Sequence, residues 1–124
     1  MSIKKEKNEE WFWEQISSSQ SDRVKLKEVL SSFDKEDIIS FQEFFVDLSS
    51  ELQDTPFIGY MEESEDGVED IAHWIVSKGK QFYENILREP DKTPYSVEGR
   101  SEEILYGIAN EVYFSKFDAT LDIY

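Results

Sequence analysis

The alternation of hydrophobic and polar side chains is clearest between Asp34 and Pro56. Hydrophobic side chains recur there at offsets of 3, 7, 10 and 14 residues from the first, the spacing of one face of an α-helix. Asp34 is suited to cap the start of this helix, and Pro56 ends it because proline disfavours helical dihedral angles in the preceding residue. The pattern predicts a helix whose buried stripe is Ile38, Phe41, Phe45, Leu48 and Leu52.

Four further segments show helical spacing, and no segment shows strand-like alternation long enough to compete. They cover about residues 9–17, 22–33, 65–88 and 101–116. Asn8 and Ser64 precede two of them as caps. Gly79 interrupts the 65–88 segment, which indicates either a close helix crossing or a kink. The segment 55–64 has room for one more turn of structure.

Three consecutive aromatic residues lie in the first predicted helix. Because neighbouring residues on a helix point about 100° apart, these side chains cannot all be buried or all be exposed. We expect Phe12 and Trp13 in the core and Trp11 partly exposed, where it can contact a partner.

Composition sets the class of protein. A chain of 124 residues is typical of one domain, and its 39% hydrophobic and 15% aromatic content can supply a core. We expect an all-α, compact single-domain bundle of about five helices over residues 1–124, with 1–7 as a flexible N-terminus and 117–124 unassigned. The absence of cysteine excludes disulfides and thiolate metal sites. No apolar stretch approaches the ~20 residues that cross a bilayer, so we expect a cytoplasmic protein.

Acidic side chains concentrate in the middle of the chain. The net charge is −15, from 28 acidic and 13 basic residues. Residues 36–77 contain twelve acids and no Lys or Arg, which a random draw at this composition gives in about 1% of cases. Like charges held this close repel one another, so the asymmetry favours a cationic partner that covers them. The plainer interpretation is a solvated face that serves only solubility.

The predicted helices place these acids on definable faces. In the 34–54 helix five acids fall within about 80° of one another, opposite the hydrophobic stripe: Glu36, Glu43, Asp47, Glu51 and Asp54. The start of the 65–88 helix continues the negative charge with no compensating lysine. The candidate partner-binding residues are Glu43, Asp47, Glu51, Asp54, Glu62, Glu63, Glu65, Asp66, Glu69 and Asp70, together with Trp11.

Catalytic and metal chemistry find little support in the sequence. His73, the one histidine, lies three, four and seven residues after acids on its own helix face. A metal site or an acid–base pair is one interpretation, and a salt-bridged surface histidine is the favoured one. A calcium loop that starts at Glu62 fails because its twelfth position is His73, where a bidentate glutamate is needed. No nucleophile elbow or phosphate-binding loop is present, and we expect no catalytic residue, no metal and no cofactor.

Short motifs follow one another in a definite order along the chain. Phe12-Trp13-Glu14 comes first, and Ser64-Glu65-Asp66-Gly67 opens the segment that carries Trp74-Ile75-Val76-Ser77-Lys78-Gly79. Pro90-Asp91 and Glu103-Ile104-Leu105-Tyr106 follow. Over most of the chain these motifs resemble the bacterial family named domain of unknown function 4240, whose pattern has a longer, alanine-rich helix before the serine motif. The resemblance implies a helical fold and, since some members occur among toxin and immunity genes, an immunity-like role.

We expect a binding protein rather than an enzyme. The leading hypothesis is an immunity-type protein that neutralises a basic toxin or nuclease through a carboxylate-rich face, and a nucleic-acid mimic that acts on a host nuclease or DNA-binding protein is a close variant. The alternative is a scaffold or accessory module with mainly apolar contacts. The charge opposes direct binding of nucleic acid, since phosphate contacts need clustered cations. No membrane partner is expected, and the sequence leaves the oligomeric state open.

Overall fold

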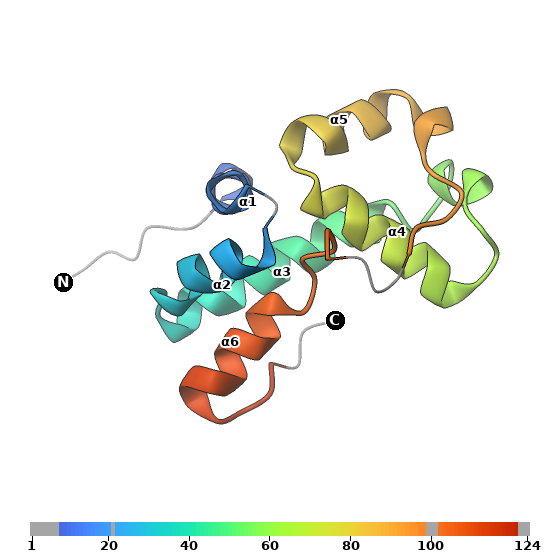
Figure 1. The fold of residues 1–124 in the computed structure, drawn as a ribbon. Coiled ribbons are helices and arrows are strands. Elements are labelled where there is room, and N and C mark those ends of the chain that lie inside the picture. The colour runs from blue at the N-terminus through green and yellow to red at the C-terminus, as the bar shows by residue number, and fades with distance from the viewer. Residues whose placement is uncertain (1–7, 21, 99–101, 122–124) are drawn as a thin grey trace.

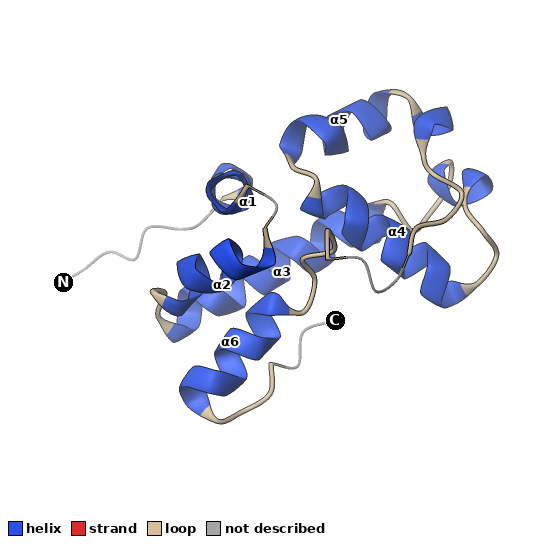
Figure 2. Ribbon diagram, in the orientation of Figure 1, coloured by secondary structure: helices blue, strands red, loops and turns tan. Residues whose placement is uncertain are grey.

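The computed structural model describes residues 8–20, 22–98 and 102–121, which form helices, turns and loops without a strand (Figures 1 and 2). Two short 3₁₀ turns, η1 Phe57–Tyr60 and η2 Pro90–Lys92, lie between the α-helices, and η1 is the extra turn expected in the 55–64 segment. The all-α class is confirmed. The segment 1–7, expected to be a flexible N-terminus, lies outside the described residues. The α-helices of the described chain are α1 Glu9–Ser19, α2 Arg23–Ser31, α3 Lys35–Glu51, α4 Glu65–Ser77, α5 Lys80–Arg88 and α6 Ile108–Phe117.

Polar side chains fix the starts of four helices. Asn8 and Ser64 each accept a hydrogen bond from the backbone N–H group three residues along, as predicted. Asp34 caps α3 in the same way, and Asp22 caps α2. Each cap satisfies an N–H group that has no partner within its own helix. The starts of these helices therefore follow from local sequence.

Helix α3 is the central element of the fold, and it contacts α1, α4 and α6 (Figure 1). Its predicted stripe is buried, with Phe41 and Phe45 each 1% exposed. Phe12 of α1 packs against both rings, at centroid distances of 4.8 and 5.9 Å. Trp13 is also buried and Trp11 is half-buried, as the helical geometry predicts.

The predicted 65–88 helix is two helices, and Gly79 separates them. This glycine has φ = 107°, a conformation that side-chain-bearing residues rarely adopt, and it serves as the N-cap of α5. In Figure 1, α5 turns away from the line of α4 at this point. The expected interruption at Gly79 is thus a complete break in the helix.

The last helix starts later than its pattern indicates. Residues 104–105 are buried but not helical, and α6 begins only after Gly107, which has φ = 99°. The Leu105 N–H donates to the Ser77 hydroxyl (2.8 Å), and the Arg23 guanidinium donates to the Ile104 carbonyl (2.7 Å). These contacts tie the segment to the end of α4 and to α2. In the tail, Leu121 is buried, and residues 122–124 lie outside the described part of the chain.

Candidate protein-binding surface

The start of α4 is built around a serine cap and a glycine. The Ser64 hydroxyl accepts a hydrogen bond from the Gly67 N–H (3.0 Å) and donates one to a carboxylate oxygen of Glu62 (2.6 Å). The Glu62 side chain lies so close over Gly67 that a Cβ atom there would come within 2.3 Å of it. The Ser-acid-acid-Gly motif therefore has a structural role, since it holds Glu62 against the first turn of α4.

Asp70 lies in the electrostatic field of its acidic neighbours. Partial burial, together with the charges of Asp66 and Glu62, raises the pKa of the Asp70 carboxyl above its ordinary value. Ionisation is harder than for a fully exposed aspartate, because it places a charge in a partly buried site that is already negative. Carboxylates from the 61–64 segment and from α4 thus share one field.

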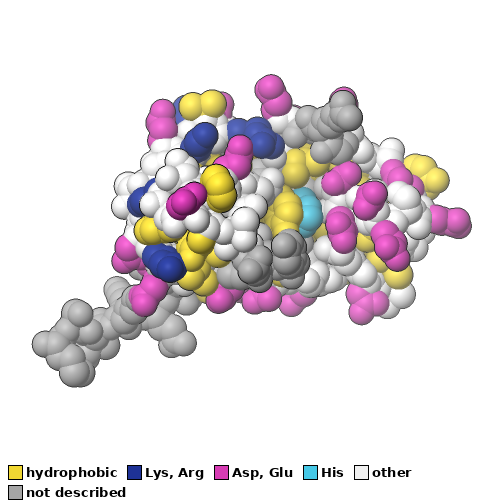
Figure 3. Space-filling view, turned by 90° about the horizontal axis from the view of Figure 1, so that it is seen from below, with side chains coloured by type: hydrophobic (Ala, Val, Ile, Leu, Met, Phe, Trp, Pro, Cys, Tyr) yellow, Lys and Arg dark blue, Asp and Glu magenta, His cyan; other side chains and the backbone are white. Residues whose placement is uncertain are grey.

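No cation neutralises this field within the part of the chain that the structure describes. None of the ten acids predicted to bind a partner forms an ion pair there. Figure 3 shows acidic side chains gathered to the right of the histidine, whereas the Lys and Arg side chains visible on this face lie to its left. Ion pairs elsewhere among the described residues include Lys78 with Glu103, Lys80 with Glu10 and Glu84, and Lys92 with Glu89.

The predicted residues of α3 form a group separate from those of α4. At about 100° per residue, Glu43, Asp47 and Glu51 lie about 60–140° around α3 from Val46, which faces α4. The Tyr83 hydroxyl of α5 approaches a carboxylate oxygen of Glu51 at 3.4 Å, and Asp54 accepts a hydrogen bond from the next backbone N–H. The carboxylates that remain together form what we term the acidic surface: Glu62, Glu63, Glu65, Asp66, Glu69 and Asp70.

Trp11 lies beside the α3 group. Its ring packs against Phe33 at a centroid distance of 5.7 Å and against Phe44 at 6.5 Å. Phe44 projects from α3 about 160° away from Val46, which faces α4. Trp11 therefore stands at the edge of the core, on a different side of α3 from the acidic surface.

A groove between α3 and α4 adjoins the acidic surface, with a volume of about 280 Å³. It joins three segments that are distant in the sequence, so no spacing rule within one segment could reveal it. The one predicted residue in its wall is Glu69. Its lining residues are Val46, Ser49, Ser50 and Gln53 of α3, Glu69 and His73 of α4, and Tyr106.

His73 is part of this groove, and the prediction that it is a salt-bridged surface residue is wrong. Its ring stacks on Tyr106, with centroids 3.8 Å apart and planes within 5°, and Phe45 packs against it at 6.0 Å. Burial lowers the pKa of His73 to about 4, because the charged form would lose its hydration. The imidazole is therefore neutral at pH 7 and forms no ion pair among the described residues.

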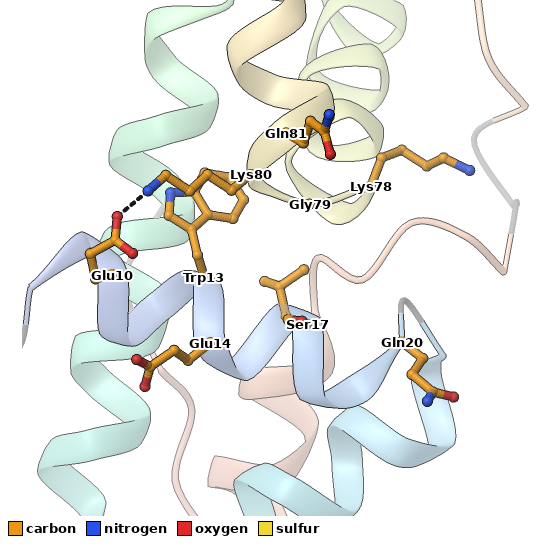
Figure 4. Close-up of a pocket in the computed structure, with 10 residues that line it drawn as sticks. Glu10, Trp13, Glu14, Ser17, Gln20, Lys78, Gly79, Lys80 and Gln81 are labelled. Carbon is orange, nitrogen blue, oxygen red and sulfur yellow. Dashed lines mark hydrogen bonds and ion pairs between the residues drawn. The ribbon is translucent and has the colours of Figure 1, made fainter.

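A second cavity, of about 600 Å³, lies between α1 and the α4–α5 junction (Figure 4). Glu10, Trp13 and Glu14 of α1 face Gly79 and Lys80 across it. Lys80 pairs with Glu10, as the dashed line in Figure 4 marks, so the charges that meet here neutralise each other. Two of the sequence motifs, the one around Trp13 and the one that ends at Gly79, thus meet at one place in the fold.

The described residues form neither a metal-binding cluster nor a membrane-spanning helix. No group of three or more His, Asp or Glu side chains there is arranged to hold a metal ion. None of the helices in the described ranges is long and apolar enough to cross a membrane.

Most of the chain is shared with a known family. The sequence model of the family described as "Protein of unknown function (DUF4240)" matches residues 7–115. That range contains all ten predicted acids and both motifs that meet at the second cavity. No curated protein and no solved structure matches the chain.

Proposed function

The chain belongs to this family, whose description assigns no activity, and we propose that it is a non-catalytic protein that binds a basic protein partner through the acidic surface. One observation carries the proposal. The six carboxylates of this surface are concentrated on α4 and the residues just before it, and no Lys or Arg pairs with them within the described chain.

The energetics of the acidic surface support a cationic partner. The raised pKa of Asp70 reflects the cost of holding its negative charge in a partly buried place and beside Asp66 and Glu62. A basic surface that docked there would reduce this repulsion and would be drawn to the site by long-range attraction, which raises association rates by about 10- to 1000-fold. Lysines and arginines of the docked partner would pair with the carboxylates that have no Lys or Arg partner among the described residues.

The form of this function that we favour is an immunity-type inhibitor in the cytoplasm, which neutralises a basic toxin or nuclease. Enzymes that bind nucleic acid line their substrate sites with Lys and Arg, because phosphate contacts need cations. A carboxylate-rich helix start can occupy such a site and exclude the substrate. A mimic of nucleic acid that acts on a host nuclease or DNA-binding protein would use the same contacts.

The test compares two triple variants that remove equal charge. The first, Glu65→Gln with Asp66→Asn and Glu69→Gln, neutralises half of the acidic surface. The control, Glu28→Gln with Glu98→Gln and Glu111→Gln, neutralises exposed acids elsewhere. Wild type and control are expected to capture the same basic partner from a native lysate, with an association rate that falls steeply as salt rises.

The first variant is expected to associate at least about tenfold more slowly at low salt. Equal rates for all three proteins would contradict the proposal. An acidic captured partner would contradict it as well.

A scaffold with apolar contacts is a second candidate, and one observation favours it. Ile58 and Tyr60 of η1 are 39% and 44% exposed, and Tyr95 is 68% exposed. The Glu62 N–H donates to the Tyr95 carbonyl (2.8 Å), which ties these apolar side chains to the edge of the acidic surface. If they carry the affinity, salt will hardly change the association rate, while Tyr60→Ala and Tyr95→Ala will speed dissociation.

A further inference from the structure

The groove between α3 and α4 has the size of a side-chain pocket. Its volume of about 280 Å³ lies just below the range of ~300–1,000 Å³ typical of sites for drug-sized molecules. It opens beside the acidic surface, because Glu69 belongs to both. A cationic partner that covers Glu69 can therefore reach this groove as well.

The α3 wall of the groove presents oxygen lone pairs. The hydroxyls of Ser49 and Ser50 donate their hydrogens to the carbonyls of Phe45 (2.7 Å) and Val46 (2.9 Å). Each hydroxyl oxygen can then only accept, and Ser50 is the exposed one of the two, since Ser49 is 1% exposed. The amide nitrogen of Gln53 points back to its own helix, 3.4 Å from the Ser49 carbonyl, which leaves the Gln53 carbonyl oxygen for a ligand. This wall is suited to a group that donates several hydrogen bonds.

The α4 wall adds an unneutralised negative charge. Glu69 is exposed and has no ion pair or hydrogen bond in the described chain. The other titratable groups that line the groove are His73, which is neutral at pH 7, and Tyr106. No Lys or Arg is among the lining residues. The groove therefore favours a ligand that is both cationic and rich in donors.

A guanidinium group meets these requirements better than an ammonium group. It is planar, carries five N–H donors in a fixed arrangement and is less strongly hydrated, so it loses less on leaving water. Its apolar stem can lie along Val46 and the stacked rings of His73 and Tyr106. We propose that this groove receives an arginine side chain of the basic protein partner, a refinement that rests on the proposed function.

The test uses a five-residue peptide, Gly-Gly-Arg-Gly-Gly, with analogues that carry lysine or citrulline in place of arginine. Binding is followed by NMR through the His73 ring and the Gln53 side-chain amide. The arginine peptide is expected to shift both signals, the lysine peptide to bind more weakly, and the uncharged citrulline peptide to leave them unchanged. Free arginine is expected to bind more weakly than the peptide, because its carboxylate meets the acidic surface.

Two variants with the same change of charge distinguish binding in the groove from general attraction to the negative charge of the acidic surface. Glu69→Gln is expected to weaken binding of the arginine peptide by about two- to fivefold, the range of an exposed ion pair. Glu65→Gln, on the same helix but outside the groove lining, is expected to have a smaller effect. Circular dichroism confirms that both variants keep their helices.

Three outcomes would overturn the groove proposal: equal affinity for the arginine and lysine peptides, equal effects of the two variants, or signals that no peptide shifts. Tighter binding of free arginine than of the peptide would also overturn it, because the groove would then be a small-molecule site. None of these results affects capture of a basic partner by the acidic surface. The proposed function is overturned by its own test, if the triple variant associates with the partner as fast as wild type does or if the captured partner is acidic.

Discussion

The two ends of α4 carry charge in different ways. At its start, the acidic surface gathers six carboxylates that no cation pairs with in the described chain. At its end, Lys78 pairs with Glu103 at 3.8 Å, and Lys80, just beyond Gly79, pairs with Glu10 of α1. Both ends suit the helix dipole, because acids stand at the start and lysine at the end. Among the residues that the structure describes, only the far end is neutralised.

The ion pairs at the far end of α4 link elements of the fold, whereas the carboxylates at its start remain available to a partner. The pairs at the far end join α4 and α5 to α1 and to the segment before α6, which are distant in the sequence. Trp74 adds to the same junction, because its indole N–H donates to Glu103 (2.7 Å). The carboxylates at the start make no such long-range link within the described ranges, where the Glu62 carboxylate accepts a local hydrogen bond from Ser64. They are therefore free to serve binding.

Lowering the pH is expected to act in opposite directions on the stability contributed by the acidic start of α4 and by the groove beside it. The loss of stability caused by His73 in the groove is the largest effect that we predict. His73 has a pKa of about 4 in the folded chain and about 6.5 when unfolded, so the unfolded state binds more protons between these values. Stability is therefore lost as the pH falls through this window, by about 2 kcal/mol between pH 7 and pH 5. Urea unfolding at the two pH values measures the loss.

The matched variant for this prediction is His73→Gln, which keeps a polar side chain but cannot titrate. Its stability is expected to change much less between pH 7 and pH 5 than that of wild type. The raised pKa of Asp70 acts in the opposite direction, since protonation there relieves repulsion and stabilises the folded state as the pH falls. A pH dependence of equal size in wild type and His73→Gln would show that the buried ring is not its source.

At the far end, Gly79 tests whether the break between α4 and α5 is required. With φ = 107°, the position strains any residue that has a Cβ, although a Cβ there would contact nothing within 4 Å. Gly79→Ala is expected to cost about 1–2 kcal/mol of unfolding free energy through backbone strain alone. Thermal unfolding measures it, and Gly59→Ala, at another open glycine without positive φ, is the control. If Gly79→Ala were more stable than wild type, the backbone at this position would not strain a residue with a Cβ.

At the acidic start, Ser64→Ala removes the cap of α4 and the anchor of Glu62. The expected loss is about 1 kcal/mol, the usual value of an N-cap serine. Ser64→Asp should retain most of the stability, because aspartate also caps helices, but it places one more negative charge beside Glu62. Urea unfolding of the two variants at low and high salt separates these effects, since salt screens only the repulsion. Equal stability of wild type and Ser64→Ala would exclude the cap as a source of stability.

Local sequence predicts the parts of this molecule that depend on one helix at a time. The caps Asn8, Asp34 and Ser64 and the stripe of α3 lie within a few residues of what they stabilise, so spacing alone identifies them. The groove is different, because the segment before α6 folds back to stack Tyr106 on His73. That contact depends on how α6 and α4 pack on α3, which no pattern along the chain specifies.

The smallest expected effect concerns a single charge at the acidic start. Asp70→Asn removes a carboxylate whose ionisation is opposed by burial and by Asp66 and Glu62, so the variant is expected to be slightly more stable than wild type at pH 7. Because the site is largely open to solvent, screening limits the gain to less than about 1 kcal/mol, and high salt should reduce it further. Glu111→Gln, an exposed acid on α6, is the control and should change little. Slow association with the partner together with this gain in stability would mean that the same repulsion which weakens the free protein is what the partner relieves.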